Sequence, residues 1–312
     1  MSVPDQIVRL ENRGMTIVDR QKTEEYLSRI GYYRLSAYWY PFRATAPKAG
    51  GVIQALDTFK PGTSFKTVVD LYAFDKALRL HLLDALERIE ISVRTSIALR
   101  LGAYDPLAHR NSSLLDGKFA KLPDPRTGRP KHTEWLRKLD EKANSSKEEF
   151  AVHFRTKYSD SHMPVWIAVE LLDFGPLSHF LAGMRWADKT AIARQHGLPR
   201  PDLFVSWIRS LSVVRNVCAH HARLWNKPLV DQPKPPNVGE VPVLDHLMTS
   251  PYRNTRLYAA CALARYMLHV VNPRSQWPLR LREHLKTFPQ SPHISLQASG
   301  FPTDWDQLPL WQ

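Results

Sequence analysis

The sequence predicts an all-α fold in which amphipathic helices pack into one bundle, and three observations support it. Apolar residues recur at steps of three and four over long stretches that contain no Gly or Pro. Strand-like alternation is weak and scattered. No segment repeats at a fixed period, which excludes solenoids and propellers. The 312 residues, 43% of them hydrophobic and 23% charged, are enough to bury an ordinary globular core.

The first 64 residues (1–64) predict a small helical appendage that packs on the core. The run from Gly31 to Tyr40 contains five aromatic residues, which is too many for a free linker. These side chains belong either to the core or a packed interface, or to a surface that stacks on nucleobases: Tyr32, Tyr33, Tyr38, Trp39 and Tyr40.

The core is expected to span residues 65–272 and to begin with the longest helix, from Phe65 to Arg100. Its apolar positions keep helical spacing throughout: Leu71, Leu78, Leu82, Ile89, Val93 and Ile97. Residues 106–130 follow with Asp-Gly, Pro-Asp-Pro and Thr-Gly-Arg-Pro sequences, which are typical of an exposed loop. We interpret this stretch as an insertion on the bundle.

Two helices are expected in the middle of the core. A buried helix covers residues 164–173, breaks at 174–176 and resumes near Ser178. A short helix over residues 189–195 ends at Gly197, which is a natural left-handed cap.

The last core helices follow. Asp202 is expected to cap a helix that runs to about Trp225, before Pro228 stops it. A proline-rich loop is expected at residues 231–242 and a core helix at 254–271. The C-terminal helix and tail span 273–312 and contain a short helix at 279–287.

The chain is strongly basic. Its 43 Lys and Arg residues against 30 Asp and Glu give a net charge of +13 and a pI near 9.8. A field of this sign attracts polyanions, of which nucleic acid and anionic membranes are the obvious examples. The alternative is charge that serves solubility alone.

Membrane anchoring is not expected. The most apolar stretch, residues 257–271, is shorter than the roughly 20 residues of a membrane span and contains Arg265 and His269. The polar N-terminus lacks the apolar segment of a signal peptide. Two cysteines, Cys218 and Cys261, cannot form a disulfide framework or a cysteine-based zinc site. We therefore expect a cytoplasmic protein with no membrane partner, no metal and no other cofactor.

A carboxylate-free helix in the second half of the chain carries the candidate chemistry. Residues 203–230 contain no Asp or Glu. One face of the helical wheel is apolar: Phe204, Ile208, Leu211, Cys218 and Trp225. The opposite face is basic or polar: Arg209, Ser212, Asn216, His220 and Arg223. An exposed helix normally intersperses carboxylates, so this face predicts a phosphate-binding surface. The expected RNA contacts are Arg209, Ser212, Arg223 and Lys227.

Arg215 and His220 supply the two functions that RNA cleavage needs without a metal. The guanidinium binds two phosphate oxygens and opposes the charge of the phosphorane. The imidazole exchanges protons near neutral pH, with the ribose 2′-hydroxyl or with the departing 5′-oxygen. Asn216 lies one turn from His220 and is expected to orient its ring. Attack by the 2′-hydroxyl leaves a 2′,3′-cyclic phosphate, so the expected substrate is RNA and DNA is inert.

The two side chains lie about 140° apart on the wheel, because Arg215 and His220 are five residues apart. One chain alone is therefore poorly arranged to bring both side chains to the same phosphate. Two copies that meet around a two-fold axis bring both arginines and both histidines to one cleft, with one imidazole as base and the other as acid. A homodimer with a composite active site is therefore part of the predicted mechanism.

The run from Arg215 to His220 matches the R-N-x-x-x-H form of the HEPN ribonuclease motif. With its flanks it resembles the Abi-like family of bacterial abortive-infection proteins. Other segments are similar to that family too: 31–43, 72–79, 87–94, 164–178 and 300–305. The resemblance implies a HEPN-type helical bundle, dimerisation and metal-independent RNA cleavage in phage defence or toxin–antitoxin control. It carries over Arg215, Asn216 and His220 as site residues and an antitoxin protein or regulatory RNA as a further partner.

The chain contains one such motif, because Arg94 is followed at the fifth place by Leu99 and Arg100 by Asp105. That departs from single-chain effectors with two HEPN motifs and again indicates a dimer.

Several residues have a second interpretation. Glu87 and Glu90, with Arg88 and Arg94, form either a solvated charged face or a carboxylate cluster that orients the motif across the bundle. An isolated histidine at the position of His220 is usually a packing residue, but the acid-free basic face favours catalysis.

His221 lies near the apolar side of the wheel, so we interpret it as a packing residue. The adjacent pair His220 and His221 suggests a metal, but neighbouring helical residues point about 100° apart and no Cys or carboxylate joins them.

The predicted function is a metal-independent endoribonuclease that cleaves single-stranded RNA. The alternative is a non-catalytic RNA-binding or regulatory protein that retains the HEPN fold. A DNA-binding helical module ranks last, since the sequence has no clear helix–turn–helix pair.

Overall fold

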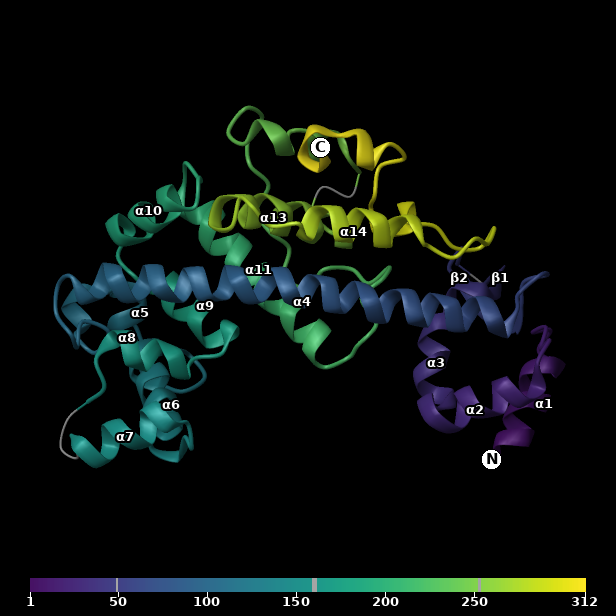
Figure 1. The fold of residues 1–312 in the computed structure, drawn as a ribbon, viewed down its shortest axis with the longest axis horizontal. Coiled ribbons are helices and arrows are strands. Elements are labelled where there is room, and N and C mark those ends of the chain that lie inside the picture. The colour runs from purple at the N-terminus through teal and green to yellow at the C-terminus, as the bar shows by residue number, and fades with distance from the viewer. Residues whose placement is uncertain (49, 159–161, 252–253) are drawn as a thin grey trace.

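Helix α4 (Phe65–Gly102) is the axis of the molecule in the computed structural model, which describes residues 1–48, 50–158, 162–251 and 254–312. At 1.5 Å per residue its 38 residues extend about 57 Å. The N-terminal helices lie at one end of α4 and the middle region lies at the other (Figure 1). In the described residues, fourteen α-helices and a single two-stranded sheet confirm the predicted all-α class.

The sequence of α4 explains its length. Ser64 caps the helix, and its hydroxyl accepts a hydrogen bond from the Thr67 N–H at 3.1 Å. The helix ends two residues beyond the predicted Arg100. All six apolar positions that the spacing predicts are buried: Leu71, Leu78, Leu82, Ile89, Val93 and Ile97. Helices pack on several sides of α4, so it is the centre of the core.

Three helices form the N-terminal region: α1 (Val3–Asn12), α2 (Arg20–Ile30) and α3 (Tyr32–Trp39). Gly31 separates α2 from α3 with φ +92°, a backbone conformation that residues other than glycine rarely adopt. Tyr38 and Trp39 are buried, whereas Tyr33 is 90% exposed. The aromatic run is therefore partly core and partly surface.

A β-hairpin connects α3 to α4, and the sequence does not predict it. Strands β1 (Arg43–Pro47) and β2 (Ile53–Phe59) pair antiparallel, with a register shift between Arg43 and Thr45. Most of its residues are exposed, so they lack the apolar alternation that reveals a half-buried strand. Arg43 ties the strands together by donating from Nη2 to the Ala55 carbonyl at 3.2 Å.

The middle region occupies the other end of α4. Its helices are α5 (Gly117–Ala120), α6 (Lys131–Ser145), α7 (Glu149–Lys157), α8 (Val165–Ala168), α9 (Phe174–Ala182) and α10 (Trp186–Gln195). The insertion at residues 106–130 is not wholly an exposed loop, because it buries four side chains: Ala108, His109, Leu115 and Ala120.

The break predicted at residues 174–176 is wrong. The chain leaves the helical conformation at Leu172, where ψ is 130°, and α9 begins at Phe174. Pro176 lies in the first turn of α9, where its missing N–H costs no helical hydrogen bond. Trp166, within the helix that the sequence predicts to be buried, is 47% exposed. Gly197, with φ +73°, follows α10 as predicted.

Helix α11 (Pro201–Ala219) crosses α4, and α13 (Leu257–Val271) and α14 (Trp277–Lys286) pack along another side of α4 (Figure 1). Helix α12 (His246–Thr249) and seven 3₁₀ turns complete the described elements: η1 (Tyr40–Phe42), η2 (Ser112–Leu114), η3 (Val169–Leu171), η4 (Pro242–Leu244), η5 (Gln297–Ser299), η6 (Trp305–Gln307) and η7 (Pro309–Trp311). Within the described ranges, no helix combines the length and apolarity that crossing a membrane requires.

Candidate active site at the end of helix α11

Helix α11 ends at Ala219, before both histidines, and not near Trp225 as the sequence predicts. His220 is the C-cap, and His221 has a left-handed backbone with φ +56°. The helical wheel therefore does not apply beyond Ala219. The five residues predicted to form the apolar face are nevertheless all buried: Phe204, Ile208, Leu211, Cys218 and Trp225.

Two backbone hydrogen bonds close the end of α11. The His221 N–H donates to the Cys218 carbonyl, and the Ala222 N–H donates to the Val217 carbonyl, both at 3.1 Å. Together with the left-handed residue they form a Schellman motif, in which Gly is the usual residue at the position of His221. The loop of residues 220–226 starts here and carries His220 at the rim of the helix end.

The start of α11 also differs from the prediction. Arg200 is the N-cap residue, Pro201 is the first helical residue, and Asp202 lies inside the helix. Asp202 pairs with Arg200 at 3.1 Å and with Lys234 at 3.4 Å. Its carboxylate near the positive end of the helix dipole is favourable even though it is not the cap.

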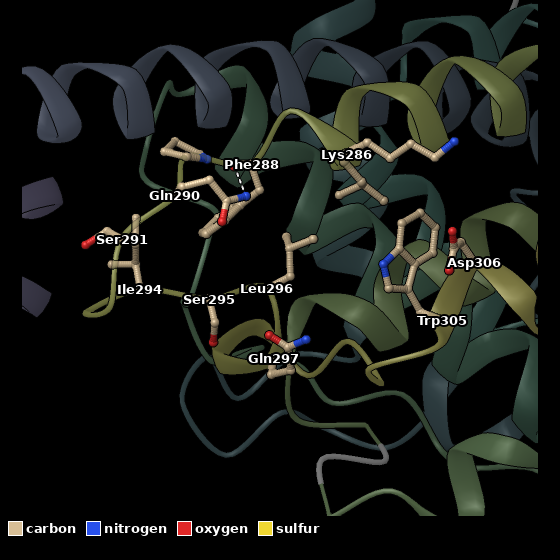
Figure 2. Close-up of a pocket in the computed structure, with 12 residues that line it drawn as sticks. Lys286, Phe288, Gln290, Ser291, Ile294, Ser295, Leu296, Gln297, Trp305 and Asp306 are labelled. Carbon is tan, nitrogen blue, oxygen red and sulfur yellow. Dashed lines mark hydrogen bonds between the residues drawn. The ribbon is translucent and has the colours of Figure 1, made fainter.

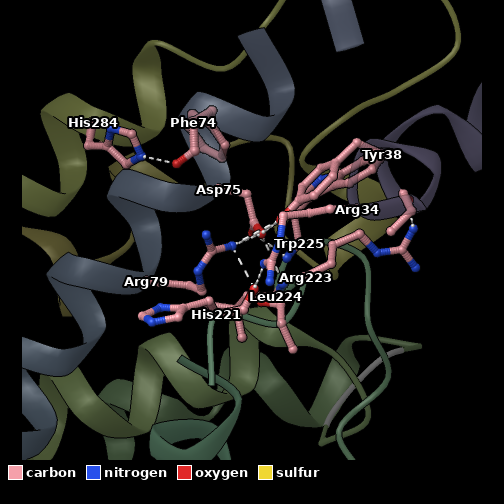
Figure 3. A network of polar contacts seen from close by, with 12 residues as sticks. Arg34, Tyr38, Phe74, Asp75, Arg79, His221, Arg223, Leu224, Trp225 and His284 are labelled. Carbon is pink, nitrogen blue, oxygen red and sulfur yellow. Dashed lines mark hydrogen bonds and ion pairs between the residues drawn. The ribbon is translucent and has the colours of Figure 1, made fainter. Parts of the chain in front are cut away.

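The buried carboxylate of Asp75, on α4, fixes the loop of residues 220–226. It accepts the backbone N–H groups of Leu224 at 3.0 Å and Trp225 at 2.6 Å. It also accepts the Tyr38 hydroxyl at 2.7 Å and pairs with Arg79 at 2.5 Å. Figure 3 shows these groups converging on Asp75. Hydrogen bonds to an ionised acceptor are stronger than neutral ones, so α4 holds the loop firmly.

Helix α3 also holds this loop. Its Arg34 donates from Nη1 to the His221 carbonyl at 2.8 Å, and Arg79 on α4 donates to the Ala222 carbonyl at 3.3 Å (Figure 3). Arg223, predicted to contact RNA, is half-buried and donates to the Ala37 carbonyl of α3 instead. Its guanidinium thus supports the loop, and its contact with RNA stays a prediction.

A chain of charges connects α4 to the motif on α11. Glu90 is 8% exposed and accepts from Arg94 Nη2 at 2.8 Å, while its other oxygen lies 3.8 Å from Arg215 Nε. Arg94 also donates to the Leu172 carbonyl at 2.8 Å. Burial raises the pKa of Glu90 above its ordinary value, and the positive charges of Arg94 and Arg215 oppose that rise.

Glu90 and Arg94 therefore do not form the solvated face that was the alternative. Glu87, also considered as a supporting residue, is exposed and keeps the character of a solvated side chain. The structure brings Glu90, but not Glu87, to the guanidinium of Arg215.

Asn216 and His220 are exposed, and the side chain of Arg215 is 30% exposed. Asn216 Oδ1 accepts from Arg215 Nη1 at 3.4 Å, and its carbonyl accepts from the His220 N–H at 2.9 Å. The side chain of Asn216 thus contacts Arg215 and not, as the sequence predicts, the imidazole of His220. All three motif residues lie at the surface, on one rigid helix end.

The residues of the expected phosphate-binding face differ in exposure. Ser212 is 3% exposed, and its hydroxyl donates to the Arg209 carbonyl at 2.7 Å, so it is not a surface group. Arg209 is exposed but pairs with Asp231, one residue beyond the acid-free stretch. Lys227 is half-buried in the loop after the helix.

Four residues that support the site are not among the site residues that the sequence predicts: Asp75, Arg79, Arg34 and Tyr38. One signal was available for two of them. Asp75 and Arg79 are four residues apart, a spacing that forms ion pairs in helices, within a long apolar helix. Their partners 150 residues away are backbone groups, which no side-chain pattern reveals.

A cavity of about 280 Å³ is lined by residues between Leu285 and Asp306 (Figure 2). Trp225 touches its wall, since Nε1 donates to the Ser295 carbonyl at 3.3 Å. In the described part of the chain, no buried polar side-chain atom that lacks a partner lines this cavity.

The fold and the site define an all-α protein with an arginine–asparagine–histidine cluster on an anchored helix end. The chain belongs to the Abi-like protein family, whose model matches residues 25–226, more than half of its length. The match ends directly after the loop of residues 220–226 and includes Arg215, Asn216 and His220. No curated protein and no solved structure matches the chain. Membership of this family suggests a role in abortive infection.

Proposed function

We propose that the protein is a metal-independent endoribonuclease of the HEPN type that cleaves single-stranded RNA. One observation carries the proposal. A half-buried arginine, Arg215, is braced by the buried carboxylate of Glu90 and shares an anchored helix end with the exposed imidazole of His220. Cleavage of a phosphodiester by a ribose hydroxyl uses two such groups, a positioned cation and an exposed side chain that can transfer protons.

The proposed reaction breaks the bond between phosphorus and the 5′-oxygen and forms one between phosphorus and the 2′-oxygen. One imidazole takes the proton of the 2′-hydroxyl, and the 5′-oxygen leaves with the bond electrons and receives a proton. Arg215 binds the non-bridging oxygens, whose negative charge grows in the transition state. The products are a 2′,3′-cyclic phosphate and a 5′-hydroxyl.

The proposal includes a homodimer, because acid and base are needed on opposite sides of one phosphate. His220 and Arg215 are exposed enough to meet their counterparts in a second copy. Two copies would supply one imidazole as base and one as acid. In the cell, we propose that this activity serves phage defence or a toxin–antitoxin pair whose antitoxin is a protein or an RNA.

The test is cleavage of single-stranded RNA in EDTA by the wild type, Arg215→Ala and His220→Ala. The wild type is expected to cut RNA and leave DNA of the same sequence intact, and each variant is expected to lose about 10²-fold or more. His221→Asn is a matched control, since it changes an adjacent exposed imidazole and keeps a residue that tolerates positive φ.

Equal loss in His221→Asn would contradict the role of His220, and dependence on a metal would contradict the mechanism. Intact RNA with tight, salt-sensitive binding would support a non-catalytic RNA-binding protein instead. Light scattering tests the dimer: full activity of a monomer would exclude the composite site.

A further inference from the structure

A second cavity, of about 190 Å³, lies between the middle helices and has features of a ligand site. Part of its lining is apolar and comes from α6, α7, α8 and the segment before α8: Leu139, Phe154, Met163 and Ala168. The lining also contains polar and charged groups: His109, Arg110, Asp140, Asn144, Arg155 and His162. All of these residues belong to the described part of the chain.

His109 is the residue of this cavity that points to a ligand. The residue is 1% exposed, and its Nδ1 is buried without a hydrogen-bond partner. Its position is fixed, because its carbonyl contacts the His132 imidazole at 2.8 Å and its ring packs against Trp135. An unpaired buried polar atom is unfavourable, so a ligand that hydrogen-bonds to Nδ1 would remove that cost.

The charged groups around the cavity already have partners within the protein. Arg110 and Asp140 form a bidentate pair, with distances of 2.7 and 3.0 Å, and Arg155 donates to the carbonyls of Ala143 and Ser146. Burial lowers the pKa of His109 to about 4, so its imidazole is neutral at pH 7 and offers one donor and one acceptor nitrogen. Asn144 adds both a donor and an acceptor at the exposed rim. The hydrogen-bonding groups of His109 and Asn144 fit a molecule whose own edges carry both donors and acceptors.

The size and shape of the cavity limit the kinds of ligand that it can hold. The cavity is smaller than the roughly 300–1,000 Å³ of sites for drug-sized ligands, so it accommodates one small ring system. The rings of Phe154 and Tyr158, 5.1 Å apart, provide aromatic surface for a planar molecule. We propose that this cavity binds a single nucleobase, of a free nucleoside or of an RNA strand, through His109, Asn144 and the apolar wall.

Calorimetric titration of the full chain with adenosine, guanosine, cytidine and uridine tests the proposal. At least one nucleoside is expected to bind with one-to-one stoichiometry, and ribose 5-phosphate is not. His109→Phe keeps a planar ring without the nitrogen and is expected to weaken binding about tenfold, as the loss of one buried hydrogen bond predicts. Asn144→Ala, at the exposed rim where folding is safe, should weaken binding in the same direction.

Gln290→Ala, in the cavity of Figure 2, is the matched control and should leave affinity unchanged. Repeating the titration with a short 2′-O-methyl RNA separates the two sources of the base. An equal effect of His109→Phe on RNA and nucleoside indicates a base within a strand, and an effect on the nucleoside alone indicates a free ligand. Absence of nucleoside binding, equal binding of ribose 5-phosphate, or unchanged affinity in both cavity variants would overturn the inference. No RNA turnover is involved, so the result is independent of the proposed nuclease activity.

Discussion

Replacing Asp75 by alanine is expected to lower the free energy of unfolding by at least about 3 kcal/mol. The carboxylate is fully buried, pairs with Arg79, and accepts the backbone N–H groups of Leu224 and Trp225. Removing one member of a buried ion pair costs about 3–5 kcal/mol, because the other charge is left without compensation. Each loop N–H left unsatisfied adds about 1–3 kcal/mol, partly offset where water enters.

Urea unfolding followed by tryptophan fluorescence measures this change, and Asp84→Ala is the matched control. Asp84 lies on the same helix and pairs with Arg88 and Arg280, but its side chain is 34% exposed. Exposed ion pairs contribute about 0–1 kcal/mol, so the control should lose no more than that. A loss below about 1 kcal/mol for Asp75→Ala, or equal losses in both variants, would refute the assignment of Asp75 as the anchor of the loop.

Three further substitutions test separate features. His221→Gly should raise the free energy of unfolding by about 1 kcal/mol in thermal or urea unfolding, because glycine adopts φ +56° without strain; a destabilised variant would contradict the Schellman cap. Since burial raises the folded-state pKa of Glu90, the wild type should lose stability as pH rises from the ordinary to the raised pKa. Glu90→Gln lacks this titration, so its free energy of unfolding relative to the wild type should increase over that pH interval. Urea unfolding at several pH values measures this difference, and a difference that does not change with pH would contradict the raised pKa of Glu90. Gly183→Ala should destabilise the protein by about 1–3 kcal/mol, since the new Cβ would lie 2.3 Å from a Phe119 ring carbon; an unchanged melting temperature would show that the ring has room to move.

The core of the fold could be predicted from the sequence because helical periodicity records burial directly. Every apolar position expected on α4 is buried, and so is the apolar face expected on α11. The hairpin β1–β2 could not be predicted in this way, because its largely exposed residues carry no such record. Gly31 marks the junction of two helices that the sequence indicates only as a helical appendage.

At the site, residue types could be predicted but their surroundings could not. The motif of Arg215, Asn216 and His220 is visible in the sequence, and the structure places Glu90 beside its arginine. The end of α11 could not be predicted, since a histidine takes the left-handed position where glycine is usual. Arg223 continues the helical pattern beyond that end, which is why its inward contact with α3 was missed.

The contact between Asp75 and Trp225 joins residues 150 positions apart, and this separation sets the order of events on the ribosome. At about 5–20 residues per second, synthesis takes roughly 8–30 s to pass from one to the other. During that interval Asp75 and Arg79 can pair only with each other and with the preceding α3. The motif emerges after α3 and the Asp75–Arg79 pair that support it. A nascent chain therefore carries no assembled site until well over half of its 312 residues have been made, and the proposed cleavage of RNA could begin only after that point.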